Sequence, residues 1–361
     1  MLTASAFFLV ALEFSMKMGL VGYAGSGKST VFEWLTGGKP DPSKVQQGQT
    51  AMADVPDERL AGIAAVMKPK KTTYTQVAVL DTPGLMLDEK KDNARRLGIL
   101  REANGLVVVL DGFTRTDFAA QLTRFRDELL FADLEIVSNR VPKVEAGLKK
   151  AKPQKEREAD EAELALLRRV VAGLESGKPA SQFGLTADED KALRSFQLLT
   201  LKPEIVFVNR GDSGFNDPLP ADLLALAPTA TQAPAKLELE LLAMDEADRT
   251  AFMGDYGITA FRRGETIRAM FYGVGREVFF TVGEDECRTW SIPKGCDAVE
   301  AAGCIHRDLA DKFVRANVIG YEDFIACGLS EKEAKARGLM RTEGKTYVVK
   351  DADVMHILAG H

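Results

Sequence analysis

Residues 18–30 of the chain read MGLVGYAGSGKST, and they are the strongest indication of the fold in the sequence. It matches the pattern G-x-x-x-x-G-K-[ST] in full, from Gly22 to Ser29. The apolar residues 18–21 predict a short strand, and residues 29–35 predict the start of a helix. A strand, a glycine-rich loop and a helix N-terminus in this order predict an α/β domain that binds a phosphate chain.

The residue types of this loop suit phosphate and Mg²⁺. Glycines let successive backbone N–H groups point at a phosphate chain, and the helix dipole adds positive charge at the same place. Lys28 is expected to reach the β- and γ-phosphates of a nucleotide, and the Ser29 hydroxyl to bind Mg²⁺. The nucleotide-binding residues predicted in the loop are Gly22, Ala24, Gly25, Ser26, Gly27, Lys28, Ser29 and Thr30.

The composition is that of an ordinary folded protein. The chain has 361 residues, of which 45% are hydrophobic and 28% charged, and this length predicts two or three domains. Its formal net charge of −6 encodes no general attraction to nucleic acid or to an anionic membrane, so any RNA contact has to come from a local patch. The four cysteines lack C-x-x-C spacing, and buried free thiols in a reducing cytosol are favoured over a zinc site.

Residues 1–16 precede the first predicted strand and carry no motif. The apolar run at 4–12 is too short to span a bilayer, and neither a basic start nor a small-residue cleavage site marks a secretory signal. We therefore expect a dispensable extension, with Met16 or Met18 as an alternative start. The expected location is the cytoplasm, without a membrane partner.

Two further stretches are expected to respond to the γ-phosphate. The polar residues 37–50 end in Thr50, which is expected to close over Mg²⁺ and the γ-phosphate. The apolar residues 77–80 predict a strand that leads into Asp81-Thr82-Pro83-Gly84, a D-x-x-G motif. Asp81 is expected to hold Mg²⁺ through water, and the Gly84 N–H to sense the γ-phosphate.

The base of the nucleotide is expected to lie beside another strand end. Residues 205–208 predict a strand that ends in Asn209-Arg210-Gly211-Asp212. In this N-x-x-D pattern Asn209 bonds the base and braces the phosphate loop, Arg210 lies flat on the ring, and Asp212 accepts from guanine N1–H and its 2-amino group. Ala235 and Lys236 are the predicted supporting loop, in which the Ala235 N–H faces the guanine carbonyl oxygen.

The remaining segments predict two further parts. Val137, Val141, Val144 and Leu148 form one helical seam, and Leu167, Val170 and Leu174 form another after a highly charged stretch. Residues 133–196 therefore predict two antiparallel helices with a charged tip, and a plain structural insertion is the alternative. Beyond a helical linker, residues 277–292 predict a hairpin with a turn at 293–295, residues 298–313 a helix, and short strands lie around Val318 and at 347–349.

Taken together, these motifs resemble the Obg-related YchF family of P-loop NTPases. The tail is specific, because ECRTWSIPKG, CIHRDLADKFVRANVIGYEDF and EGKTYVVKDADVMH are similar to the family's TGS domain. The resemblance implies a Ras-like P-loop domain at 17–132 and 197–245, a coiled-coil insertion at 133–196, a helical linker at 246–275 and a β-grasp TGS domain at 276–361. It also implies binding to ribosomes or structured RNA through the TGS and helical domains, and no binding to DNA.

The chain departs from the family pattern in three places. Ala24-Gly25-Ser26 stand where the family usually has Pro-Asn-Val, and the missing asparagine weakens the case for potassium-assisted hydrolysis. The segment after DTPG is shorter than the family's glycine-rich one. Asp212 stands where the family tends to have glutamate, and its shorter carboxylate predicts GTP over ATP, with ATP as the family-based alternative.

The predicted function is a Mg²⁺-dependent GTP-binding and GTP-hydrolysing protein that couples nucleotide state to a ribosomal or RNA partner. Leu85 stands where many relatives place a glutamine that orients the attacking water. Because leucine cannot hydrogen-bond water, slow intrinsic turnover is expected. A nucleotide-gated scaffold with negligible turnover is the second hypothesis, and a small-molecule kinase, against which N-x-x-D argues, is the third.

Overall fold

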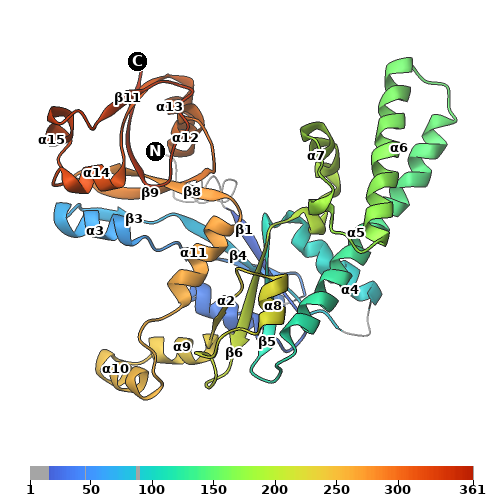
Figure 1. Cartoon of the computed structure of the whole chain (residues 1–361), viewed down its shortest axis with the longest axis horizontal. Coiled ribbons are helices and arrows are strands. Elements are labelled where there is room, and N and C mark those ends of the chain that lie inside the picture. The colour runs from blue at the N-terminus through green and yellow to red at the C-terminus, as the bar shows by residue number, and fades with distance from the viewer. Residues whose placement is uncertain (1–15, 45, 87–89, 361) are drawn as a thin grey trace. The chain divides into compact units, whose positions relative to one another are not determined.

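The computed structural model describes residues 16–44, 46–86 and 90–360 (Figure 1). The chain divides into two compact units, one of residues 1–51 and 78–263 and the other of residues 52–77 and 264–361. The predicted extension lies outside the described residues except for Met16. Met16 is buried and its carbonyl accepts a hydrogen bond from the Ala78 N–H at 2.8 Å, so this residue belongs to the fold and not to an extension.

The first unit is built on a six-stranded sheet in the order β2-β4-β1-β5-β6-β7. The pairs from β4 to β7 along this order are parallel. Their central strands are nearly continuous apolar runs because helices cover both faces of the sheet. The predicted strands at 18–21, 77–80 and 205–208 are confirmed. The strands are β1 (Lys17–Val21), β2 (Gln49–Asp54), β4 (Gln76–Asp81), β5 (Gly105–Gly112), β6 (Glu204–Arg210) and β7 (Thr231–Ala233).

Alternate residues of the central strands pack on opposite layers of helices. Leu106 and Val108 of β5 join a core cluster with Leu122 and Phe125. On the other face, the rings of Trp34 and Phe207 lie 5.5 Å apart. The helices of this unit are α2 (Lys28–Thr36), α4 (Lys90–Gly98), α5 (Phe118–Leu148), α6 (Gln154–Glu175), α7 (Ala187–Leu193), α8 (Ala221–Leu226), α9 (Ala235–Leu242) and α10 (Glu246–Asp255).

The helical hairpin consists of α5 and α6, and its first helix is longer than predicted. Helix α5 starts at Phe118 and not near residue 133. Its first half packs on the sheet, and its second half carries the predicted seam, so one helix serves two cores. Val137 and Val144 of α5 pack in one cluster with Leu167, Val170 and Leu174 of α6, which confirms the paired seams.

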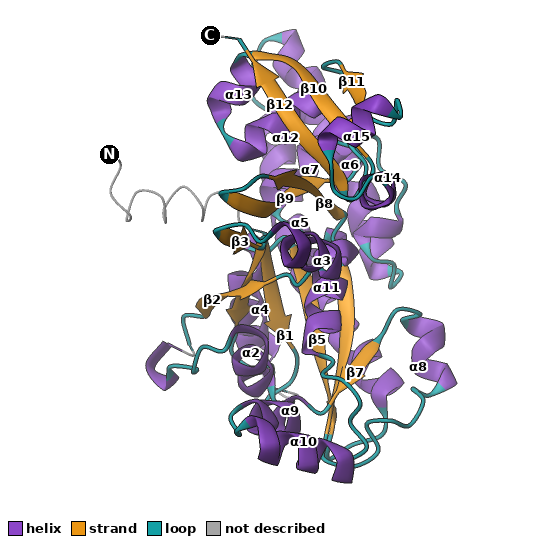
Figure 2. Ribbon diagram, turned by 90° about the vertical axis from the view of Figure 1, so that its left-hand side faces the viewer, coloured by secondary structure: helices purple, strands orange, loops and turns teal. Residues whose placement is uncertain are grey.

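The second unit contains a mixed sheet in the order β11-β10-β12-β8-β9-β3 (Figure 2). Strands β8 and β9 form the predicted antiparallel hairpin, and β8 pairs in parallel with β12. Ala298, Ala301 and Ala302 of α12 pack on this sheet beside Phe279 and Val318. The elements are α11 (Arg263–Gly273), β8 (Arg276–Val282), β9 (Glu286–Pro293), α12 (Ala298–Ile305), α13 (Arg307–Asp311), β10 (Phe313–Ile319), α14 (Tyr321–Ala326), α15 (Glu331–Ala336), β11 (Arg341–Glu343) and β12 (Asp353–Ala359).

Some local predictions for this unit were wrong. The hairpin's own turn lies between β8 and β9, where the Gly283 N–H donates to the Glu286 carbonyl, and the predicted turn at 293–295 follows β9, where the Cys296 N–H donates to the Pro293 carbonyl at 3.2 Å. The predicted helix is split at His306, which has extended backbone and accepts from the Asp308 N–H to start α13. The predicted strand at 347–349 forms only an isolated bridge between Val348 and Asp297.

Residues 52–77 form part of the second unit, which the sequence did not predict. Helix α3 (Glu58–Met67) starts at Asp57, whose carboxylate accepts from the first N–H groups of the helix. Strand β3 (Lys71–Thr73) pairs in parallel with the edge of β9. Arg59 bonds Asp351 at 2.6 Å, so the segment between Thr50 and the DTPG motif is held by the C-terminal sheet and by ion pairs.

Candidate nucleotide site

The phosphate loop connects β1 to the first turn of α2, as predicted. Gly22 and Gly27 have φ values of +152° and +82°, in the region that favours glycine. A Cβ on Gly22 would lie 2.5 Å from the Val109 carbonyl oxygen, and one on Gly27 would lie 2.2 Å from the Asn209 amide nitrogen. Both glycines are therefore required by close packing as well as by backbone conformation.

Lys28 lies inside its own loop. Its ammonium group donates to the Tyr23 carbonyl at 2.9 Å and to the Gly22 carbonyl at 3.2 Å, and the side chain is buried. Burial lowers the pKa of Lys28 from 10.5 to about 8, against the opposing effect of Asp81. A phosphate chain would supply the negative charge that this buried ammonium lacks.

Three buried polar atoms at the predicted motifs have no hydrogen-bond partner among the described residues. They are Ser26 Oγ, Asp81 Oδ1 and Asn209 Oδ1, and the remaining atom of this kind is Thr231 Oγ1. Leaving a buried polar group unpaired costs about 1–3 kcal/mol, so such atoms need an explanation. Their position on the phosphate loop, the D-x-x-G strand and the N-x-x-D motif points to a polar ligand.

Asp81 and Ser29 together offer the oxygens that Mg²⁺ prefers. The Ser29 hydroxyl donates to Asp81 Oδ2 at 3.1 Å, which leaves its lone pairs for a metal ion. Asp81 is buried, and its other carboxylate oxygen has no hydrogen-bond partner within the described segments. Thr50 lies on β2 with an exposed side chain, and its neighbour Gln49 is the residue that reaches Asp81, at 3.2 Å.

Leu85, the residue that follows the DTPG motif, is hydrogen-bonded to the phosphate loop through both its carbonyl and its N–H. The Ala24 N–H donates to the Leu85 carbonyl at 2.8 Å, and the Leu85 N–H donates to the Gly22 carbonyl at 3.0 Å. A Cβ on Gly84 would lie 2.6 Å from the Ala24 Cα, so the motif passes close to the loop. The Leu85 side chain is buried in the core and does not reach the site.

In the base motif, the predicted bracing of the phosphate loop by Asn209 is seen. The buried Asn209 side chain donates to the Ser26 carbonyl at 3.1 Å and so braces the phosphate loop. The Arg210 guanidinium lies 4.9 Å from the Phe118 ring, and its Nε donates to the Gln232 side chain at 2.8 Å. Arg210 therefore contacts these two side chains, and its flat position over a base remains a prediction.

The other predicted base-site residues lie at the ends of two elements. The Asp212 side chain is exposed in the loop after β6. Ala235 is the first residue of α9 and is buried, and the exposed Lys236 side chain approaches Glu240 at 3.8 Å. The contacts of these residues with a base remain predictions.

Phe113 lies beside the phosphate loop and the N-x-x-D motif, and the sequence did not predict it as a site residue. Its side chain is 46% exposed. A Cβ added to Gly211 would lie 3.3 Å from the Phe113 Cβ, and one added to Gly27 would lie 3.5 Å from its ring. The Phe113 N–H donates to Asp111 at 3.1 Å, and Gln121 bonds the Asp111 backbone, so the ring stands on a fixed turn. An aromatic residue after Asp-Gly at a strand end was the available signal.

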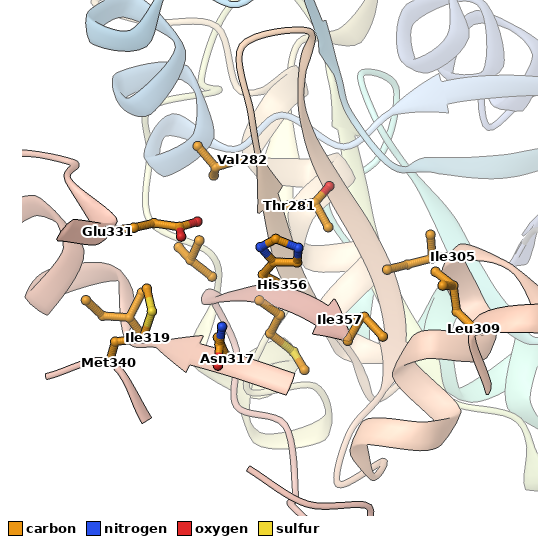
Figure 3. A pocket seen from close by; sticks show the side chains of 12 residues that line it. Thr281, Val282, Ile305, Leu309, Asn317, Ile319, Glu331, Met340, His356 and Ile357 are labelled. Carbon is orange, nitrogen blue, oxygen red and sulfur yellow. The ribbon is translucent and has the colours of Figure 1, made fainter. Parts of the chain in front are cut away.

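The described part of the second unit has a separate pocket of about 270 Å³ (Figure 3). It lies where the pairing between β8 and β12 ends. Beyond the pair Phe280–Val354 these two strands no longer pair with each other. His356 and Thr281 face the opening, together with apolar side chains such as Ile357 and Leu309. The lining residues include no lysine or arginine, so the pocket offers no positive charge to a phosphate chain.

The described parts of the chain hold no cluster of metal-binding side chains and no helix that could span a membrane. No group of at least three His, Cys, Asp or Glu residues is placed to hold a metal ion there. The four cysteines are free thiols. No helix in the described segments is long and apolar enough to cross a membrane.

Comparison with known proteins gives the family. A model described as 50S ribosome-binding GTPase matches residues 17–140, and a model of the YchF C-terminal region, described as a protein of unknown function, matches residues 277–359. The ribosome-binding ATPase YchF of Escherichia coli O157:H7 is 32% identical over 95% of this chain and 98% of its own length. The chain belongs to the YchF family.

Other members agree with this assignment. The ribosome-binding ATPase YchF of Bacillus subtilis is 29% identical over 95% of this chain and 98% of its own length. The solved structure of the Schizosaccharomyces pombe YchF GTPase matches with a TM-score of 0.80 and 25% identity, over 95% of this chain and 98% of that one. The family fold therefore extends over nearly the whole chain, including the P-loop unit, the helical hairpin and the C-terminal sheet.

Proposed function

We propose that this YchF family member is a Mg²⁺-dependent nucleoside triphosphatase of the cytoplasm that couples its nucleotide state to ribosome binding. The observation that carries the proposal is the group of buried, unpartnered atoms Ser26 Oγ, Asp81 Oδ1 and Asn209 Oδ1. They lie on the three motifs to which we assign the phosphate, metal and base ends of a nucleotide. Names given to relatives, as ribosome-binding ATPases and as a GTPase, support the same activity.

The chain's own residues supply position and charge. Lys28 leaves the loop carbonyls for the β- and γ-phosphates, whose negative charge it neutralises. Ser29 and Asp81 would hold Mg²⁺, with Thr50 from β2, and the metal ion when bound neutralises charge between the β- and γ-phosphates. The Gly84 N–H would contact the γ-phosphate. Because Leu85 is buried in the core, intrinsic hydrolysis is slow and a partner or another group positions the attacking water.

For the base, we propose ATP as the favoured nucleotide, which differs from the sequence prediction of GTP. Asn209 Oδ1 is a buried acceptor with no partner in the part of the chain that the structure describes, and the 6-amino group of adenine is a donor. Guanine would place its carbonyl oxygen there, and an acceptor facing an acceptor costs about 1–3 kcal/mol, or about ten- to a hundredfold in affinity. The names of the bacterial relatives support this choice. GTP is the second candidate, favoured by the Asp212 carboxylate.

Phe113 is proposed as the flat surface for the base. Its exposed ring lies beside Gly27 and Gly211, whereas Arg210 is engaged with Phe118 and Gln232. Stacking on an aromatic ring is tolerant of base type, so Phe113 adds affinity for both nucleotides and leaves the choice to polar groups.

The ribosome is proposed as the partner through the helical hairpin and the C-terminal unit. The net charge of −6 gives no general attraction to RNA, so contacts have to come from local basic residues. Arg307, Lys312 and Arg315 are exposed around α13 and the start of β10 and are the candidates for RNA phosphates. A scaffold with negligible turnover is the second candidate function, favoured by the buried Leu85.

Direct binding tests the proposal. Calorimetry should give dissociation constants for ATP and GTP with the full chain, with Lys28→Ala and with Asp212→Asn. We expect ATP to bind more tightly than GTP, Lys28→Ala to lose affinity for both, and Asp212→Asn to leave ATP binding unchanged. Equal affinity of Lys28→Ala and the parent would overturn the phosphate-site assignment, and a GTP preference that Asp212→Asn reduces would establish the guanine alternative.

A further inference from the structure

Gln49 occupies a position at the metal end of the site that no motif accounts for. It is the first residue of β2, and its side chain is half-buried. Its amide nitrogen donates to Asp81 Oδ2 at 3.2 Å, and its amide oxygen accepts from the Asp41 N–H at 2.8 Å. The Gln49 amide group therefore forms two hydrogen bonds, one with the metal-site carboxylate and one with the loop that follows α2.

The two oxygens of the Asp81 carboxylate are treated differently. Oδ2 accepts from both Gln49 and the Ser29 hydroxyl. Oδ1 is buried and has no hydrogen-bond partner in the described chain. Two donors on one oxygen fix the rotation of the carboxylate, so the other oxygen keeps its lone pairs for a ligand.

The backbone before Gln49 is packed against the strand that carries Asp81. Gly48 has a φ of +78°, and a Cβ on it would lie 3.1 Å from Leu80 and 3.4 Å from the Asp81 carbonyl oxygen. A glycine is therefore needed for this approach, and it brings the Gln49 side chain to the carboxylate. The backbone packing therefore brings Gln49 to Asp81, so their hydrogen bond is more than an incidental contact between surface side chains.

We propose that Gln49 is a positioning residue for Mg²⁺: it holds Asp81 by Oδ2, which leaves Oδ1 available to a metal ion or its water, and it ties Asp41 to that carboxylate. The inference rests on the proposed function and adds a residue to its metal site. Groups that orient metal-binding side chains commonly contribute about ten- to a hundredfold to metal affinity. Because the same side chain bonds the Asp41 N–H, metal binding and the position of this loop are coupled.

The test is the Mg²⁺ dependence of nucleotide affinity in the full chain. The dissociation constant of a fluorescent ATP analogue is measured over a Mg²⁺ series and in EDTA, for the parent and for Gln49→Ala. We expect the EDTA value to be unchanged and the Mg²⁺ concentration for half-maximal enhancement to rise about tenfold or more. Mn²⁺ binding to the protein–nucleotide complex, followed by electron paramagnetic resonance, should weaken by a similar factor.

Gln76→Ala is the matched control, because Gln76 makes the same kind of bond, to Asp54 at 2.7 Å, away from Asp81. It should leave the Mg²⁺ dependence unchanged. An unchanged Mg²⁺ dependence in Gln49→Ala would overturn the Gln49 inference alone, since the parent would still bind Mg²⁺ and nucleotide. Equal loss of affinity with and without Mg²⁺ would also overturn it, because that marks a structural role. A parent chain that binds no nucleotide would overturn the proposed function itself.

Discussion

At the residue scale, Lys28 carries a positive charge at a place where burial disfavours the charged form. Burial of its ammonium group lowers the pKa of Lys28 from 10.5 to about 8, although two loop carbonyls accept hydrogen bonds from it. A phosphate chain favours the charged form, so nucleotide binding raises the pKa of Lys28 again. Proton uptake on binding is the consequence at alkaline pH.

Nucleotide affinity should therefore fall with rising pH. Below a pKa of about 8 Lys28 already carries its proton, whereas above it binding has to take up a proton. Between about pH 7 and about pH 9 we expect roughly a tenfold loss of affinity, measured by fluorescent-nucleotide titration. Lys28→Ala is the control that reports the nucleotide's own titration. A parent curve parallel to that of the variant would contradict the role of Lys28.

Phe113 gives a second prediction at this scale. Phe113→Ala should weaken ATP and GTP binding by the same factor, because stacking on one base contributes about 1–3 kcal/mol regardless of its type. Phe252→Ala removes a ring of similar exposure, 44% against 46%, from α10 and should change neither affinity. The measurement is the pair of dissociation constants. A change in the ratio of ATP to GTP affinity would show that Phe113 selects the base.

At the element scale, the strands that lead into the motifs could be predicted because buried parallel strands are short apolar runs. The phosphate loop, the D-x-x-G motif and the N-x-x-D motif could then be placed, because each one directly follows a predicted strand. The start of α5 could not be predicted from its seam, because Phe118 to Leu129 face a different core from Val137. Arg210 could not be placed either, since its partners Phe118 and Gln232 come from elements distant in sequence.

Asp133 links α5 to the chain that returns from the hairpin. The carboxylate is fully buried and accepts from the Leu199 and Thr200 N–H groups at 3.0 and 2.8 Å and from Arg101 at 3.0 Å. Asp133→Ala leaves these donors unpaired and should destabilise the fold by about 3–5 kcal/mol in denaturant unfolding. Glu163→Ala removes an exposed pair with Arg140 and should cost less than about 1 kcal/mol. Equal effects would contradict the anchoring role of Asp133.

At the scale of the whole molecule, the segment between Thr50 and Asp81 is shared between the two units. Residues 52–77 cluster with residues 264–361, and β3 extends the C-terminal sheet. The sequence could not predict this, because β3 is a three-residue polar strand whose partner β9 lies more than 200 residues away in the chain. Deleting residues 276–361 therefore also removes the partner of β3, so it is a poor test of ribosome binding.

Charge reversal tests the partner surface without that side effect. Arg307→Glu, Lys312→Glu and Arg315→Glu combined should weaken ribosome co-sedimentation and make it less sensitive to salt. Nucleotide affinity should stay unchanged, because all three side chains are exposed on the C-terminal unit. If the variant bound ribosomes as tightly as the parent and with the same salt dependence, these three residues would not form the ribosome-binding surface.

The central claim is that the protein hydrolyses a nucleoside triphosphate at its phosphate loop and that the ribosome controls the rate of this hydrolysis. The measurement is multiple-turnover phosphate release from ATP and from GTP, with and without ribosomes, for the parent and for Lys28→Ala. We expect slow Mg²⁺-dependent release, faster with ribosomes and faster from ATP, and none above background in Lys28→Ala. Release by Lys28→Ala at the parent rate would contradict the account.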